Sequence, residues 1–269
     1  RVEHTKYRPK GKTSRTFDGA SGGIGVRFRL TDELAFVANY TESYRAPSVE
    51  ELYNKGSHPG MGTYEIGNAN LKRERSHSFD FSLRQSDEKM QSQANFFYYP
   101  ISDFIFLAPT GNIREGLVEA IYSQGDVRFL GAEFIVNREV HDYIWLDLGL
   151  DWVDAELTSS GVPLPRIPPL RARVGLDFRY KGLGFNPEVV LTDDQDRVYT
   201  TGSETRTSGH TVINLKASYT LPRRHFSHHF SLNAFNVGDR LYRNHVSFIK
   251  GLAPEKGRGI RFSYVIKFF

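Results

Sequence analysis

The sequence predicts an all-β fold, an antiparallel transmembrane β-barrel, from three observations. Apolar and polar residues alternate with a period of two along almost the whole chain. Many of the alternating segments are longer than the ordinary strand of about five to six residues. The connections between them are by turns short and long. Long strands joined in this way are typical of barrels that cross a membrane, because short turns close one end and long loops the other.

Taken in order, the strands follow from this alternation. We expect about twelve of them, at residues 1–7, 17–30, 34–44, 73–86, 90–106, 123–138, 143–157, 169–181, 185–199, 210–221, 228–237 and 258–269. Short connections lie at 31–33, 86–89, 139–142, 182–184 and 222–227. Long connections lie at 8–16, 45–72, 107–122, 158–168, 200–209 and 238–257.

Each strand has one apolar and one polar face, because successive side chains of a strand point to opposite sides. The segment 171–181 is the clearest case. In a barrel the apolar face meets lipid, and we expect this of Val174, Leu176, Phe178, Leu215, Tyr219, Phe262, Tyr264 and Ile266. The polar face lines the lumen, and we expect this of Arg171, Arg173, Asp177, Arg179, Lys216 and Arg261.

Composition narrows the class of protein further. Hydrophobic residues make up 39% of the 269 residues and aromatic residues 13%, which is too much for a disordered chain. No stretch approaches the ~18 consecutive apolar residues of a membrane-spanning helix. The net charge of +4 is small and dispersed, so a nucleic-acid partner is not expected. The chain has no Cys, which excludes disulfides and thiolate metal sites.

Five motifs, in order along nearly the whole chain, resemble those of TonB-dependent outer-membrane receptors. They are residues 44–53 (YRAPSVEELY), 65–74 (EIGNANLKRE), 131–133 (GAE), 165–171 (PRIPPLR) and 235–239 (FNVGD), and an aromatic strand follows at the end. The resemblance implies a 22-stranded barrel of which residues 1–269 form the C-terminal portion, with the N-terminal plug absent. It also implies residence in the outer membrane of a Gram-negative bacterium.

By the same resemblance, the complete protein binds a scarce nutrient such as a metal–siderophore complex, haem or zinc. It imports that ligand with energy from the inner-membrane TonB complex, which it contacts through its missing N-terminal part. The expected partners are outer-membrane lipid, the TonB complex and a metal ion or metal chelate. We expect no resident cofactor.

The ligand-binding candidates lie in the long connections, where binding residues concentrate on a rigid scaffold. They are Tyr53, His58, Tyr64 and Glu65 in the connection 45–72, and His245 in the connection 238–257. His58 is the leading metal ligand, because imidazole with a nearby carboxylate suits zinc or a similar metal. A generic polar loop is the alternative, and the connection also resembles that of receptors for zinc or haem. His225, His228 and His229 cluster at a short turn, which favours a solvated turn.

We find no Ser-His-Asp arrangement that indicates a catalytic triad, so we expect no enzyme activity. Two other functions stay open. One is a passive or structural 12-stranded outer-membrane barrel, since an even number of strands can close by itself. The other is a soluble carbohydrate-binding β-protein, in which the apolar faces form the core between two sheets.

Overall fold

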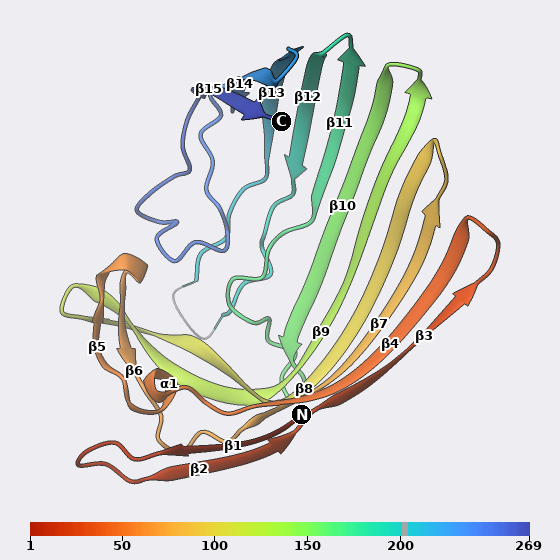
Figure 1. Ribbon diagram of the computed structural model, residues 1–269. Helices are drawn as coiled ribbons and strands as arrows, with labels where there is room; N and C mark the ends of the chain where they lie inside the picture. Colours follow the sequence, from red (N-terminus) through yellow and green to blue (C-terminus); the bar gives the residue numbers. More distant parts are fainter. Residues whose placement is uncertain (201–203) are drawn as a thin grey trace.

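The computed structural model describes residues 1–200 and 204–269, and it consists mainly of one curved antiparallel sheet (Figure 1). Eleven strands follow one another in this sheet from β3 to β15. In chain order they are β3 (Gly22–Arg29), β4 (Leu34–Arg45), β7 (Glu74–Ser86), β8 (Met90–Arg114), β9 (Leu117–His141), β10 (Ile144–Leu157), β11 (Arg171–Tyr180), β12 (Leu183–Thr192), β13 (His210–Pro222), β14 (Phe226–Phe235) and β15 (Gly259–Phe268).

The sheet is open. Its two end strands, β3 and β15, each pair with one neighbour and not with each other in the described part of the chain. The structure therefore lacks the closure that a self-contained 12-stranded barrel requires. The fold is otherwise the predicted one: nearly all-β, antiparallel and built of many strands.

The strand register sorts the side chains into rows on two faces. Asp177 shares a row with Asn186, Lys216 and, on the last strand, Arg261. The neighbouring row, on the opposite face, joins Phe178 to Phe185, Ala217, Leu232 and Phe262. The residues expected to meet lipid and those expected to line the lumen thus occupy opposite faces of the sheet. Which face meets lipid stays a prediction.

The remaining elements gather at the end of the sheet with the long connections. A separate two-stranded sheet is formed by β1 (Val2–Tyr7) and β2 (Arg15–Ala20). The connection 45–72 contains α1 (Val49–Tyr53), β5 (Lys55–His58), the 3₁₀-helix η1 (Pro59–Met61) and β6 (Thr63–Ile66). No helix in the described residues has the length and apolarity to cross a membrane.

Local chemistry explains why a helix begins in this connection. Ser48 caps α1, since its hydroxyl accepts from the backbone N–H of Glu51 and the Glu51 carboxylate accepts from the N–H of Ser48, a capping box. Glu51 also pairs with Arg45, which in turn pairs with Glu74 on β7. The motif YRAPSVEELY therefore fastens the end of β4 to the start of β7 through its arginine.

Two small cores lie at this same end. The first contains Phe17, Leu52, Leu71 and Ile105, and joins β2 and α1 to β8. The second contains Val127, Ala155 and Leu164, and joins the connection 158–170 to β9 and β10. Apolar burial thus holds the long connections against the strands, whereas the strands themselves leave one apolar face without cover.

Three expected boundaries were wrong. The expected strand 17–30 is broken at Ser21, whose N–H donates to the Arg1 carbonyl, so that β2 pairs with β1 while β3 pairs with β4. The expected long connection 107–122 is instead mostly strand, because β8 and β9 form a hairpin of two 25-residue strands. Its turn is Glu115–Gly116, both with positive φ, as a tight hairpin turn requires. The expected strand 185–199 ends at Thr192.

Candidate functional site

The long connections meet at one end of the sheet. Strand β6 pairs in parallel with the start of β9, which attaches the connection 45–72 to the β8–β9 hairpin. The Arg166 guanidinium carbon lies 3.4 Å from the centre of the Phe248 ring, which links the connections 158–170 and 238–257. The Arg166 N–H donates to Glu204, which links the connection 193–209 to both.

His58 and Glu65 lie side by side in this assembly. The strands β5 and β6 pair antiparallel, with His58 opposite Thr63. This pairing brings Glu65, two residues after Thr63, close to His58. The His58 Nδ1 lies 3.0 Å from the Glu65 Oε1. The Glu65 side chain is 3% exposed, whereas that of His58 is 53% exposed. The pair therefore has a buried anchor and an accessible imidazole.

The Glu65 carboxylate is fully occupied. Besides His58, it accepts from Thr63 Oγ1 at 3.0 Å, from Tyr122 OH at 3.1 Å and from Asn54 Nδ2 at 3.2 Å. A carboxylate only accepts, so the proton shared with His58 belongs to Nδ1. In the neutral form of the ring, Nε2 then carries the lone pair that can bind a metal centre, and this is the usual arrangement of a metal-binding histidine held by a carboxylate.

The two tyrosines of the same connection lie elsewhere. The Tyr64 side chain lies on the opposite face of β6 from that of Glu65. It is buried, and the Arg114 guanidinium carbon lies 4.4 Å from the centre of its ring. The Tyr53 hydroxyl donates to the Thr13 carbonyl at 2.8 Å. The structure therefore brings together His58 and Glu65 from the four candidates of this connection, and it adds Tyr122, which the sequence pattern did not single out.

His245 lies in a buried polar network. Its Nδ1 is 2.9 Å from Thr207 Oγ1 and its Nε2 is 3.3 Å from Glu204 Oε1. Lys250 Nζ lies 3.7 Å from the same Glu204 oxygen. The His245 side chain is 1% exposed, so both ring nitrogens are engaged inside the protein. Its geometry is that of a structural residue which joins two long connections.

Burial and pairing act on the charges of this network. Burial lowers the pKa of Lys250, and Glu204 only partly offsets that effect. Burial by itself raises the pKa of Glu204, but the bonds from His245 and from the N–H groups of Tyr199 and Arg166 outweigh it, so that the pKa lies below its ordinary value. Among the described residues no group of three or more His, Asp or Glu side chains is arranged to hold a metal ion.

A hollow of about 400 Å³ opens between the hairpin and four of the long connections. Its walls are mostly apolar, and they include Leu107 and Val118 of the hairpin and Phe248 of the connection 238–257. A second hollow of about 350 Å³ adjoins it and shares Met61 and Arg166 with the first. Arg166 is a further residue that sequence reasoning did not single out, although its motif was noted.

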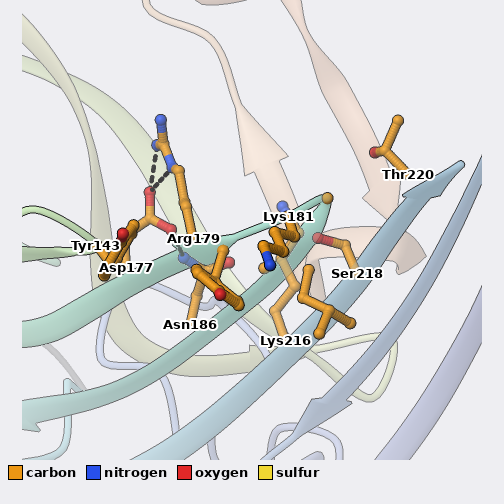
Figure 2. A pocket seen from close by; sticks show the side chains of 12 residues that line it. Tyr143, Asp177, Arg179, Lys181, Asn186, Lys216, Ser218 and Thr220 are labelled. Atoms are coloured by element: carbon orange, nitrogen blue, oxygen red, sulfur yellow. Dashed lines mark hydrogen bonds and ion pairs between the residues drawn. The ribbon is translucent and has the colours of Figure 1, made fainter. Parts of the chain in front are cut away.

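Three of the residues expected in the lumen share one polar surface near the short connections, namely Asp177, Arg179 and Lys216 (Figure 2). Asp177 pairs with Arg179 on the same strand and accepts from Asn186 of the next strand. Lys216 and Ser218 of β13 lie on the same surface. Further along the sheet Arg171 pairs with Asp151, and Arg173 with Glu188 at 3.7 Å.

The chain is similar to known proteins in family and in sequence. The family model for the TonB dependent receptor-like beta-barrel matches residues 1–237. The heme/hemopexin utilization protein C of Haemophilus influenzae (strain 86-028NP) is 25% identical over 293 aligned residues, which cover 99% of this chain and 40% of that protein. The hemoglobin-haptoglobin utilization protein B of Neisseria meningitidis serogroup C is 30% identical over 99 residues, 37% of this chain and 12% of that protein.

Solved structures share the fold. The copper transporter OprC superposes with a TM-score of 0.83 at 21% identity, covering 97% of this chain and 41% of that one. The FrpB iron transporter of Neisseria meningitidis superposes with a TM-score of 0.70 at 15% identity, covering 96% and 40%. The chain thus spans about two fifths of the length of these proteins.

Proposed function

The chain belongs to the TonB-dependent receptor β-barrel family, and on this premise we propose that it is part of a receptor that captures haem at the cell surface. Proteins of the family lie in the outer membrane of Gram-negative bacteria and take up nutrients actively; they are transport receptors rather than enzymes. In this proposal the apolar face of the sheet meets lipid, the polar face lines the lumen, and the TonB complex supplies the energy that releases haem inward.

The observation that carries the proposal is the open imidazole of His58. Its Nδ1 is held by the buried Glu65 carboxylate at 3.0 Å, and the ring is half exposed at the end of the sheet with the long connections. Histidine is the common axial ligand of haem iron, and a carboxylate on the far nitrogen fixes the tautomer and raises the basicity of the ligating nitrogen.

Haem suits this site better than a bare zinc ion. A structural Zn²⁺ site takes about four protein ligands, and the Glu65 oxygens are already occupied by four donors. Haem iron is held by its porphyrin and needs only an axial ligand from the protein. A single imidazole is sufficient for haem. The names of the curated relatives, which concern haem and haemoglobin utilization, support the same choice.

The test is a titration of the full-length receptor with haem, followed by the Soret absorption band. Replacing His58 by Ala is expected to weaken haem binding by at least roughly tenfold and to change the spectrum of the bound haem, with no loss of folded barrel. His228→Ala is the control, since this histidine lies on β14 beside Tyr264, near the short connections. Equal haem affinity and equal spectra in the wild type and His58→Ala would remove His58 from the site.

A further inference from the structure

Arg166 occupies an unusual position between the two hollows. Its backbone has a φ of +61°, in the left-handed region that residues other than glycine seldom adopt. The Arg166 N–H donates to Glu204 Oε1 at 2.7 Å, and this bond holds the turn. Residues in such conformations cluster at functional sites, where the surroundings fix a side chain in one direction. Arg166 lines both hollows.

The guanidinium of Arg166 has an aromatic neighbour but no carboxylate partner. The Phe248 ring covers one of its faces at 3.4 Å. Among the described residues no Asp or Glu oxygen lies within 4.0 Å of its side-chain nitrogens. Burial lowers the pKa of Arg166, and the more distant charges of Glu204 and Glu65 act in the other direction without cancelling that effect. The guanidinium nevertheless stays protonated and keeps its donors.

Other cations of the β8–β9 hairpin and the long connections differ from Arg166 in this respect. Lys250, which lines the same hollow, is paired with Glu204. Arg114 lies 3.7 Å from Glu119, and Arg197 pairs with both Asp154 and Glu156. A partly buried guanidinium beside apolar walls therefore offers its planar set of donors to a group from outside, and carboxylate is the group that fits such a fork in a bidentate manner.

The hollow also reaches the strand pair that carries His58. Met61, three residues after His58, lines both hollows, and Thr63, which is opposite His58 in the β5–β6 pair, lines the larger one. The charge of Glu65 is felt at Arg166. The segment that holds the imidazole, from β5 to β6, thus borders the hollow that Arg166 lines.

We propose that this hollow is the subsite for the acidic edge of the ligand, with its apolar walls against the ring system and Arg166 paired with a carboxylate. The inference rests on the proposed function, in which the ligand is haem. Haem has an apolar macrocycle and two propionate side chains, so it combines the two properties that the hollow recognises. Arg166 then determines which porphyrins bind, while His58 binds the iron.

The experiment compares haem with its dimethyl ester, in which both propionates are neutral. The full-length receptor is titrated with each, as wild type and as Arg166→Gln, Arg166→Lys and Arg197→Gln. Wild type is expected to bind haem roughly tenfold to hundredfold more tightly than the ester, as befits charge-assisted hydrogen bonds. Arg166→Gln is expected to lose this difference, with haem falling to the affinity of the ester. Arg166→Lys keeps the charge without the fork and is expected to keep part of the difference, whereas Arg197→Gln keeps all of it.

The Soret spectrum separates this inference from the proposed function. Arg166→Gln is expected to leave the spectrum of bound haem unchanged, because the iron ligand is intact. If wild type binds haem and the ester equally, or if Arg166→Gln keeps the full difference, the subsite is wrong and the haem receptor stands. If wild type binds neither porphyrin, both the proposed function and the subsite are wrong.

Discussion

The Nδ1 of His58 lies 3.0 Å from the Oε1 of Glu65, in a pair of which one member is 53% exposed and the other 3%. This asymmetry separates two tasks. The carboxylate is fixed by donors from Asn54, Thr63 and Tyr122, and it fixes the imidazole in turn. The imidazole is therefore oriented without being enclosed.

Glu65→Gln tests this orientation. The amide keeps the volume of the side chain but no longer accepts at both positions, so the Nδ1–H of His58 loses its charged partner. We expect haem affinity to fall by roughly tenfold to hundredfold, the usual effect of removing such a partner. The measurement is the same Soret titration in the full-length receptor. An affinity equal to that of the wild type would mean that Glu65 stabilises the connection 45–72 without affecting haem binding.

Gly67→Ala tests how the connection 45–72 is packed. A Cβ at this position would lie 2.6 Å from the backbone nitrogens of Tyr53 and Asn54, at the end of α1. Backbone cannot yield as a flexible side chain does, so we expect a loss of about 1–3 kcal/mol in the local stability of this connection. Limited proteolysis detects the loss as faster cleavage.

Gly60→Ala is the matched control for that variant. It lies in the same connection, and its Cβ would meet open space. Equal cleavage rates in the two variants would show that the contact with α1 is not tight.

Acid is expected to loosen the network around Glu204. The pKa of this carboxyl lies below its ordinary value of 4.5 in the folded state. A carboxyl whose pKa is lower in the folded state than in the unfolded state stabilises the fold at pH values above 4.5. This contribution is lost as the pH falls through the pKa of the folded state. Hydrogen exchange in the connection 238–257 should therefore rise as the pH is lowered below about 4.5, after correction for the intrinsic rate. In Glu204→Gln this additional rise should be absent.

The facing of the strands predicts losses of unequal size for substitutions at two residues of β11. Leu176 is 41% exposed on the apolar face, and Arg173 is on the polar face beside Glu188. Leu176→Arg is expected to destabilise the barrel by roughly 2–4 kcal/mol if the position is near the bilayer midplane. Arg173→Leu should cost much less. Refolding of the full-length receptor into bilayers measures both, and equal losses would contradict the assignment.

The open edges of the sheet predict the behaviour of residues 1–269 produced alone. In the described part of the chain β3 and β15 each leave one row of backbone groups without a strand partner. Such edges recruit other chains, so we expect aggregation or poor insertion into bilayers. A stable, heat-modifiable monomer in detergent that conducts small ions would favour the self-contained barrel instead.

Most of the sheet could be predicted because its physics is local. The alternation of a strand depends only on consecutive residues of the sequence. The strand register then places residues of the same expected face in one row, as it does for Asp177 and Lys216. The motif around Arg45 was visible as well, although its bridge from Glu51 to Glu74 appears only in space.

The rest depends on contacts between distant segments. The β8–β9 hairpin continues through residues 107–122 because β6 pairs with it, and no pattern within those residues indicates that partner. Tyr122 reaches Glu65 across 57 positions of sequence. Arg166 acquires its role from Phe248 and Glu204, which follow it by many residues, so its own motif could only suggest a turn.

The ion pairs of the polar face have a consequence for passage along it. Arg171, Arg173 and Arg179 are each matched by an acidic neighbour, Asp151, Glu188 and Asp177 respectively. These three pairs act as small dipoles whose far fields largely cancel, so they contribute no single attractive plateau to this face. In a receptor whose lumen this face lines, as we propose, a charged solute beside these pairs meets no deep electrostatic trap from them and can move past by exchanging one weak contact for the next.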